Sequence, residues 1–287
     1  MVGLPDRHGA FGGLTEGRTA MTYIDGYIVL LPAIPVAAWI LRRRADRRWT
    51  LSRARVRGMA PDSPLARLSA EVVACRRCPR LVEWREVAAA HPPARFAGER
   101  YWARPLPGWG DPQARVLLVG LAPAAHGGNR TGRLFTGDKS GDFLFASLHR
   151  TGFVNQPTST NAADGLAARD LYVAAVVRCA PPANKPLPAE RGNCLPYLAR
   201  ELELLPELHV VVALGAYAWD GALRAVAGVG AKATPRPAFG HGAEATLGRY
   251  NLLGSYHPSQ QNTFTRRLTP VMLDAVMARA RELAALD

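Results

Sequence analysis

The sequence predicts an α/β fold in which helices cover both faces of a parallel sheet. Four short runs rich in Val and Leu recur at wide intervals, at residues 115–121, 171–178, 209–215 and 250–256. Apolar runs of this length, without alternation, are typical of strands buried on both faces. The stretches between them have helical patterns, and strands that alternate with helices favour a parallel sheet. In such sheets ligands bind outside the carboxyl ends of the strands.

Helices are expected where apolar residues recur three or four positions apart. Before the first strand, residues 63–74 have this period and lead directly into Cys75. Further helices are expected between the strands and at the end of the chain, at residues 141–151, 188–205, 216–226 and 269–285. The stretch 87–107 is rich in Pro, Ala and Arg, so we expect it to be a long surface connection.

The first 58 residues differ in composition from the rest. They contain ten Arg and no Lys, and their apolar run at 27–41 has two prolines. This run is shorter than the roughly 20 residues that a membrane-spanning helix needs. Its positive charges follow it, whereas a signal peptide carries them before the apolar run. We therefore expect 1–58 to be a poorly ordered extension or the product of a start codon placed too far upstream. Residues 59–287 are expected to form one domain, with no membrane anchor.

The charge of the chain favours anionic partners. The 287 residues include 36 Lys and Arg against 23 Asp and Glu, a net charge of +13. A hydrophobic content of 48% provides enough apolar material for a core, which excludes a wholly disordered protein. The positive surface suits nucleic acid or acidic lipid, and composition does not choose between them. Because only three of the basic residues are Lys, phosphate contacts would come mostly from Arg.

The four cysteines lie beside elements that the predicted sheet could bring together. Cys75 and Cys78 form a Cys-x2-Cys pair at the end of the first helix, Cys179 follows the second strand, and Cys194 lies in the next helix. Four thiolates can hold a zinc ion or a four-iron, four-sulfur cluster, and the spacing does not separate the two. The simpler alternative is four unrelated buried thiols.

The loop after the first strand is rich in glycine and polar residues. It has no Gly-Lys pair, so it is not a phosphate-binding loop of the nucleoside triphosphatases, and the GxGxxG pattern is also absent. Glycines would allow close backbone approach, Phe135 offers an aromatic face, and Asp138 a carboxylate. Such a set suits a planar, neutral heterocycle better than a phosphate. Ordinary core packing is the simpler interpretation of Phe135.

One histidine follows the last strand of the predicted sheet. His257 stands in a Tyr-His-Pro-Ser sequence, and the segment after it is polar and then basic. An isolated histidine is more often structural than catalytic. Here, however, the following QQNTFTRR is what we expect of a loop that enters a nucleic-acid groove, with Arg266 and Arg267 available for phosphates.

Four long motifs together resemble the uracil-DNA glycosylase superfamily, and most closely its family 5, the type B iron–sulfur glycosylases. The motifs are CRRCPRLVEWRE, YWARPLPGWGDPQARVLLVGLAPAAHGGNRTGRLFTGD, VVRCAPPANKP and SYHPSQQNTFTRRLT, and the resemblance covers residues 61–286. It implies a three-layer α/β/α sandwich around a four-stranded parallel sheet. It also implies a four-iron, four-sulfur (4Fe-4S) cluster held by the four cysteines, Cys75, Cys78, Cys179 and Cys194.

The resemblance further implies a DNA glycosylase that flips out a base and hydrolyses its N-glycosidic bond, which begins base excision repair. His257 would donate to the base oxygen and Phe135 would stack on the base. Asp138 and Asn184 would orient water and stabilise the cationic sugar. Around these, the DNA is expected to contact the wedge loop residues Gln261 and Asn262 and the arginines Arg130, Arg133, Arg266 and Arg267.

The base pocket departs from that of uracil-restricted relatives. Those enzymes keep an Asn four residues before the cluster cysteine, and here that position is Ala175. Ala124 and Ala125 likewise stand where other families have an acidic or amide residue. Loss of a hydrogen-bonding group removes discrimination. The resemblance therefore implies a wider range of deaminated or damaged bases, including purines such as hypoxanthine.

Other classes remain beside the glycosylase. A non-catalytic iron–sulfur DNA-binding protein of the same fold would need the cysteines and arginines but neither Asp138 nor His257. A glycosylase with lyase activity would need an amine nucleophile, for which Lys139 is the candidate. A zinc deaminase is set aside because its His-x-Glu and Pro-Cys-x-x-Cys signature is absent. A monomer that acts on damaged DNA in the cytoplasm, at the nucleoid, is expected.

Overall fold

The computed structural model describes residues 21–24, 27–30 and 60–286, and the chain divides into two units, residues 1–51 and 52–287. In the first unit, β1 (Met21–Ile24) and β2 (Tyr27–Leu30) pair antiparallel. The rest of the predicted extension lies outside the described residues. Across the described ranges, no helix is both long and apolar enough to cross a membrane.

The second unit contains a six-stranded sheet in the order β3-β5-β4-β6-β8-β7. Its four middle strands are parallel to one another. They are β4 (Val116–Gly120), β5 (Leu171–Ala175), β6 (Val210–Leu214) and β8 (Tyr250–Ser255). The predicted four-stranded parallel sheet is therefore confirmed. The antiparallel edge strands β3 (Trp109–Gly110) and β7 (Glu244–Leu247) extend it beyond the prediction.

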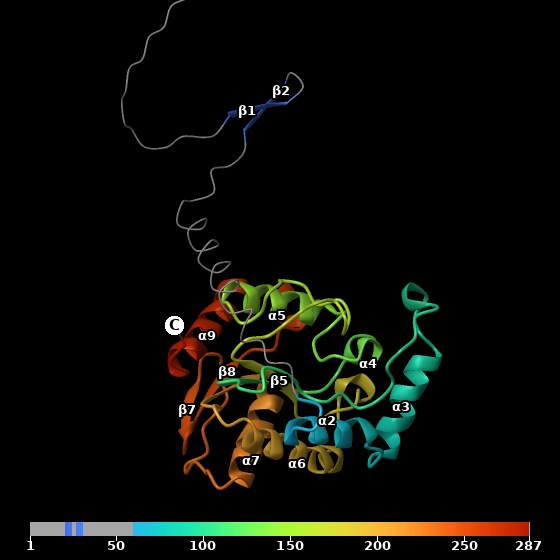
Figure 1. The fold of residues 1–287 in the computed structure, drawn as a ribbon, viewed down its shortest axis with the longest axis vertical. Coiled ribbons are helices and arrows are strands. Elements are labelled where there is room, and N and C mark those ends of the chain that lie inside the picture. Colours follow the sequence, from blue (N-terminus) through green and yellow to red (C-terminus); the bar gives the residue numbers. More distant parts are fainter. Residues whose placement is uncertain (1–20, 25–26, 31–59, 287) are drawn as a thin grey trace, which may run out of the picture. The chain divides into compact units, whose positions relative to one another are not determined.

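Helices cover both faces of this sheet, as Figure 1 shows. On one face, α2 (Pro64–Ala74), α6 (Pro188–Leu204) and α7 (Ala216–Gly228) share a buried apolar cluster with the strands. On the other face, α5 (Lys139–Arg150) and α9 (Pro270–Leu283) share a second cluster. The predicted three-layer α/β/α sandwich is thus confirmed.

The two clusters explain why the central strands have no polar alternation. In β4, Leu117 and Val119 belong to the first cluster, whereas Val116 and Leu118 belong to the second. Successive side chains of a strand point to opposite faces, so both sets must be apolar when helices cover both faces.

The stretch predicted as a surface connection is partly helical. Its first residues belong to α3 (Pro79–Ala90), and a short 3-10 turn follows at Ala94–Phe96. The periodicity of α3 is concealed because a charged residue, Arg85, occupies a buried position on it. Two further short helices, α4 (Gly128–Thr131) and α8 (Gln260–Phe264), lie in the loops after β4 and β8.

Candidate active site

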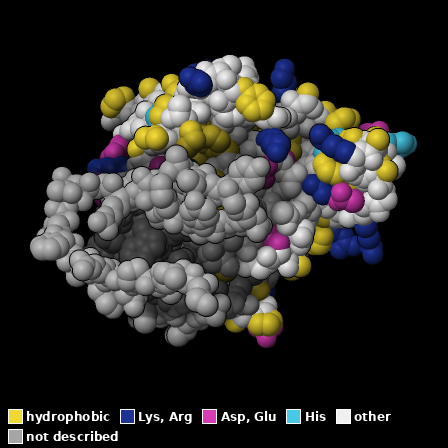
Figure 2. Space-filling view, turned by 90° about the horizontal axis from the view of Figure 1, so that it is seen from above, with side chains coloured by type: hydrophobic (Ala, Val, Ile, Leu, Met, Phe, Trp, Pro, Cys, Tyr) yellow, Lys and Arg dark blue, Asp and Glu magenta, His cyan; other side chains and the backbone are white. Residues whose placement is uncertain are grey.

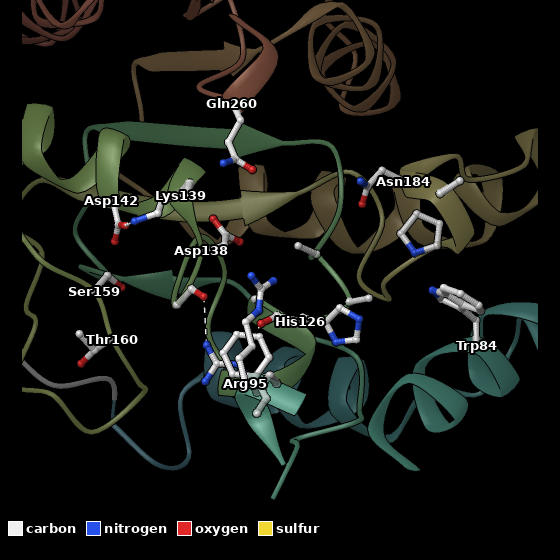
Figure 3. Close-up of a pocket in the computed structure, with 18 residues that line it drawn as sticks. Trp84, Arg95, His126, Asp138, Lys139, Asp142, Ser159, Thr160, Asn184 and Gln260 are labelled. Carbon is white, nitrogen blue, oxygen red and sulfur yellow. Dashed lines mark hydrogen bonds and ion pairs between the residues drawn. The ribbon is translucent and has the colours of Figure 1, made fainter. Parts of the chain in front are cut away.

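A pocket of about 820 Å³ lies among the loops that follow the carboxyl ends of two adjacent parallel strands. The loop after β4 contributes Ala124, Ala125 and Asp138, and the loop after β5 contributes Asn184. Gln260, at the start of α8, lines the pocket from a third segment (Figure 3). The pocket therefore lies where a parallel sheet is expected to bind its ligand.

Asp138 is held in place by the helix that it begins. It is the N-cap residue of α5, and its Oδ1 accepts a hydrogen bond of 2.9 Å from the amide of Gly141. Burial raises the pKa of this carboxyl, and the Gly141 and Ser140 amides partly oppose that rise. A Cβ atom at Gly127 would collide with Oδ2 of Asp138. The glycine in this loop is therefore needed to leave room for the carboxylate.

Asn184 enters the pocket from a strained turn. It lies in a 3-10 turn, Pro182–Asn184, where both Ala183 and Asn184 have left-handed backbone, with φ of 51° and 55°. Asn adopts this conformation more readily than most residues. Its side-chain amide makes no hydrogen bond with any other described residue, so both its donor and its acceptor are available to a ligand. Figure 3 shows Asn184 and Asp138 approaching the pocket from different loops.

Phe135 and His257 form a second pair. Their ring centroids are 6.1 Å apart and the planes are inclined by 35°. Phe135 has a φ of 55° and lies against Gly120, where a Cβ atom would come within 2.6 Å of Cζ of the ring. Burial lowers the pKa of His257 to about 4, so its imidazole is neutral at physiological pH. No described residue accepts a hydrogen bond from this ring or donates one to it.

The structure divides the three predicted catalytic residues between two pockets. Asp138 and Asn184 line the larger pocket, whereas His257 lines a smaller neighbouring pocket of about 300 Å³. Of the predicted base-pocket residues, Ala124 and Ala125 line the larger pocket. Ala175 ends β5 and is 1% exposed; it pairs in the sheet with Gly120, the residue against which the Phe135 ring packs.

Two of the predicted phosphate-binding arginines are engaged within the protein. Arg133 is 7% exposed, and it forms an ion pair of 2.7 Å with Asp164. This pairing holds the pKa of Asp164 down, at about 2. The placement of Arg133 does not support its predicted phosphate contact, because its guanidinium is buried and neutralised. Arg130 forms an ion pair of 2.6 Å with Glu99 and stacks 4.0 Å above the ring of Phe96.

The loop after His257, unlike Arg130 and Arg133, presents exposed side chains. Gln261, Arg266 and Arg267 are exposed, and neither arginine forms an ion pair with a described residue. Asn262 instead braces the loop, since its side chain donates a 2.8 Å hydrogen bond to the carbonyl of His257. On the face seen in Figure 2, Lys and Arg side chains are spread widely over the described surface, which suits a polyanionic partner.

Several pocket residues were not singled out by the sequence, four aromatic or basic side chains among them. Trp84 from α3, Arg95, Phe96 and His126 all line the larger pocket. His126 lies in the glycine-rich loop, and its Nδ1 is 3.0 Å from the hydroxyl of Tyr101. Its place in that loop was a signal for His126, and the motif that contains Cys75 and Cys78 was one for Trp84. Nothing in the periodicity marks the other two.

The four cysteines line one small cavity between α2, α3, α6 and the end of β5. Burial raises the pKa of Cys179 to about 12 and that of Cys194 to about 11. Two donors reach the sulfurs: Arg85 Nη1 lies 3.1 Å from Cys179 Sγ, and Asn193 Nδ2 lies 3.4 Å from Cys78 Sγ. Within residues 60–286, no three His, Cys, Asp or Glu side chains are grouped so as to hold a metal ion.

A buried asparagine connects this cavity to the larger pocket. Asn129 is fully buried, and its amide donates to the carbonyls of Arg85 and Ala125, at 3.1 and 3.3 Å. Arg85 contacts Cys179, and Ala125 lines the pocket. The cysteine cavity and the pocket are therefore joined through two hydrogen-bonded residues.

Comparison with known proteins places this arrangement in a family. Residues 107–281 match the profile of the uracil DNA glycosylase superfamily. The "Type-5 uracil-DNA glycosylase" of Mycobacterium tuberculosis is 54% identical over 225 residues, 78% of this chain and 83% of the relative. That of Thermus thermophilus is 52% identical over 216 residues, 75% and 96% of the two chains. A "Type-4 uracil-DNA glycosylase" of Thermotoga maritima is 33% identical over 113 residues, 39% and 50% of the chains.

The chain therefore belongs to the uracil-DNA glycosylase superfamily. Within it, the predicted resemblance to family 5 is confirmed, because the similarity to type-5 members extends over most of both chains, whereas the similarity to the type-4 member covers half of that relative or less.

Proposed function

We propose that this protein is a DNA glycosylase that excises uracil from DNA by hydrolysing the N-glycosidic bond, the first step of base excision repair. One observation carries the proposal: a half-buried carboxylate, Asp138, and an unpartnered amide, Asn184, approach one pocket from the loops of adjacent strands (Figure 3). A base inside a duplex cannot be reached, so the nucleotide must be turned out into such a pocket. The pocket, at about 820 Å³, has room for it.

Asp138 and Asn184 would act on the sugar side of the bond. Cleavage develops positive charge on the sugar, as in other oxocarbenium-like reactions. An ionised Asp138 stabilises that charge and accepts a hydrogen bond from the attacking water, while the Asn184 carbonyl accepts a second one. Because the Gly141 amide already fixes Oδ1 of Asp138, Oδ2 is the oxygen left for water and sugar.

His257 and Phe135 would act on the base side. Negative charge collects on the oxygen of the departing base, and a donor placed there usually contributes a large part of the rate enhancement. His257 is suited to this role because its lowered pKa keeps it neutral, with one N–H to donate and no partner among the described residues. Phe135, beside it, offers a ring on which the base can stack.

The substrate range would extend beyond uracil. Ala124 and Ala125 line the pocket and offer no hydrogen-bonding group to the base. Ala175, at the end of β5, likewise has no amide that could bond to the edge of a pyrimidine. It pairs in the sheet with Gly120, against which Phe135 packs. Without such groups a pocket discriminates weakly, which supports excision of other deaminated bases, hypoxanthine among them.

We also propose that Cys75, Cys78, Cys179 and Cys194 hold a four-iron, four-sulfur cluster. The support is electrostatic. Arg85 is 2% exposed, and among the described residues its guanidinium bonds only to the Cys179 sulfur. A buried guanidinium with no anion is costly, and burial keeps the free thiol neutral by raising its pKa. Thiolates bound to a cluster would supply the missing negative charge.

Zinc and a four-iron, four-sulfur cluster both take four thiolates. The four cysteines share one cavity, which suits either group. The choice of the cluster rests on the resemblance to family 5. Once bound, the cluster would cross-link α2, α3, α6 and the β5 loop, and the Arg85–Asn129 contacts would extend that bracing to the pocket.

The cluster is tested by optical spectroscopy and metal analysis. Anaerobically purified protein should be brown, with broad visible absorbance and about four iron atoms per chain. Cys179→Ser should bleach the colour and lower the thermal stability. A colourless protein with one zinc per chain would contradict the assignment.

The activity is tested on three duplexes that contain uracil, hypoxanthine or ethenocytosine. Purified protein should release uracil, and release of hypoxanthine would support the wider range. If it binds all three duplexes and releases no base, it is the non-catalytic DNA-binding protein of the same fold. Release of base with strand cleavage that depends on Lys139 would instead indicate a lyase.

We further propose that residues 59–287 are the catalytic unit, because every site residue lies there. A chain that begins at Met59 should retain the rate of the full protein. We also propose that the protein acts as a monomer. Because its substrate would be chromosomal DNA, it would act at the nucleoid.

A further inference from the structure

A second pocket, of about 300 Å³, lies beside the proposed active site. It is formed where β6 passes into α7 and where β8 ends. Three aromatic rings line it, those of Tyr217, Phe239 and Tyr256, together with the guanidinium of Arg267. His257 lines it as well, so one residue of the proposed base-excision machinery forms part of its wall.

The aromatic wall of this second pocket is held in a fixed position. Phe239 packs edge-on against Trp219, with ring centroids 6.0 Å apart and an angle of 64°. Trp219 is 3% exposed and its indole donates a 3.1 Å hydrogen bond to the carbonyl of Pro237. The Tyr256 ring packs between those of Phe239 and His241, at centroid distances of 6.3 and 5.1 Å. A rigid aromatic wall binds a flat ligand without losing much side-chain entropy.

The electrostatics of the pocket suit a ligand with an attached anion. None of the residues that line it is an Asp or Glu. Arg267 lies 4.6 Å above the Tyr256 ring and forms no ion pair with any described residue. Stacked on an aromatic ring, an Arg keeps its charge available to a phosphate. Aromatic faces and an adjacent free guanidinium together are the means by which proteins hold single-stranded nucleic acid.

The loop that separates the two pockets is one structural unit. Gln260 lines the larger pocket, and His257, three residues earlier, lines the second. Asn262, which also lines the second pocket, fixes their spacing by donating to the carbonyl of His257 at 2.8 Å. Three residues of one short, hydrogen-bonded loop therefore contribute to the walls of both pockets.

We propose that the second pocket binds a second, unpaired nucleobase of the same DNA strand, next to the nucleotide turned out for excision. The base stacks among Tyr217, Phe239 and Tyr256, and Arg267 holds its phosphate. This placement relative to the excised base rests on the proposed glycosylase function; the affinity of the pocket for a nucleobase does not. Because a base in this pocket cannot pair, the protein gains contacts on single-stranded DNA that a duplex does not offer.

The test compares binding of single-stranded and duplex DNA that contain no uracil, by fluorescence anisotropy. Phe239→Leu keeps the apolar bulk and removes the ring. It should weaken single-strand binding by about 5- to 150-fold, the range for loss of one stacked base, and leave duplex binding unchanged. Phe143→Leu, a half-buried phenylalanine on α5, is the matched control and should change neither. Phe239→Tyr keeps an aromatic ring at this position and should bind single-stranded DNA as tightly as the parent.

Other outcomes would overturn the proposal. Unchanged single-strand binding in Phe239→Leu would show that the pocket holds no base, and an equal loss on duplex would show a general effect on DNA affinity. If Phe239→Leu misfolds, Tyr217→Leu removes another ring of the same pocket and gives the same comparison. A lower single-turnover rate of uracil release at saturating duplex would place the excised base itself in this pocket. Since the binding assay requires no catalysis, it remains decisive even if the protein excises no base.

Discussion

Burial has opposite effects on the two principal ionisable residues of the site. It raises the pKa of Asp138 and lowers that of His257 to about 4, because in both cases it disfavours the charged form. His257 is thereby kept as a neutral donor. For Asp138, the hydrogen bond from the Gly141 amide offsets part of the rise in pKa and so favours the ionised carboxylate.

The His257 shift predicts how stability depends on pH. In the unfolded chain His257 takes up a proton below pH 6.5 or so, whereas in the folded protein it does so only near pH 4. Between these values the unfolded state binds more protons, so acidification destabilises the fold. His257→Gln should reduce the loss of unfolding free energy between pH 6.5 and pH 4.5, as measured by urea denaturation. His91→Gln, at an exposed position, should leave it unchanged, and an equal loss in both variants would contradict the assignment.

The sequence predicted the role of a residue that belongs to a family motif. It did not predict a role that depends on a partner far along the chain. Asp138 and Asn184 were chosen from the family motifs, and both line the pocket. Arg133 was chosen from the same loop, but its partner Asp164 lies 31 residues further along the chain. No local pattern indicates that pairing, so the sequence could not distinguish a buried arginine from one that contacts phosphate.

The loop between β4 and α5 determines the shape of the site. It begins at the end of a buried strand and ends at the N-cap of α5, so both its ends are fixed. Gly127 lies where the loop passes the Asp138 carboxylate. The loop therefore depends on a residue without a side chain at this point.

Gly127→Ala is predicted to displace Asp138 while the fold remains intact. The added methyl group would collide with Oδ2, and a displacement of about 1 Å in a catalytic group can cost roughly 100-fold in rate. Single-turnover cleavage of a uracil duplex measures the effect, and circular dichroism checks the fold. Gly192→Ala is the control, since no atom lies within 4 Å of its added Cβ. Parent-like rates in both variants would show that the Asp138 position is not critical.

The sequence pattern predicted the buried strands and helices better than the short or exposed ones. The four central strands are buried at nearly every position, which produced the apolar runs. The edge strands were missed because β3 has only two residues and only one of the four residues of β7 is buried. Helix α3 was missed in part because its buried face includes Arg85, whose partner is a cysteine sulfur 94 residues away.

At the scale of the whole molecule, the site is assembled from distant segments around the sheet. The larger pocket takes side chains from α3, from the loops after β4 and β5, and from α8. Only the parallel strand order β5-β4-β6-β8 brings these segments to one edge. The pattern predicted that edge as the ligand side, but the two-pocket arrangement depends on three-dimensional packing that periodicity does not encode.

The net charge of +13 predicts a steep salt dependence of DNA binding. Each phosphate that is neutralised adds about 0.9 to the slope of log affinity against log salt on duplex DNA. Arg266→Ala should flatten the slope by about that amount without changing which base is released. Arg279→Ala is the control, because Glu244 and Glu282 already neutralise Arg279. A slope unchanged by Arg266→Ala would show that this arginine is only a solvated surface residue.

The role of Asp138 is tested most directly by the single-turnover rate of uracil release by Asp138→Asn, compared with that of Asp142→Asn. Both carboxylates line the same pocket, but Asp142 is exposed and pairs with Lys139 at 3.3 Å. Loss of a group that positions a proton or water typically costs about 100- to 10,000-fold. We expect a loss of that size for Asp138→Asn and a rate close to the parent for Asp142→Asn. Equal rates in the parent and Asp138→Asn would show that Asp138 is not catalytic, and no uracil release by the parent would show that the protein is not a uracil-DNA glycosylase.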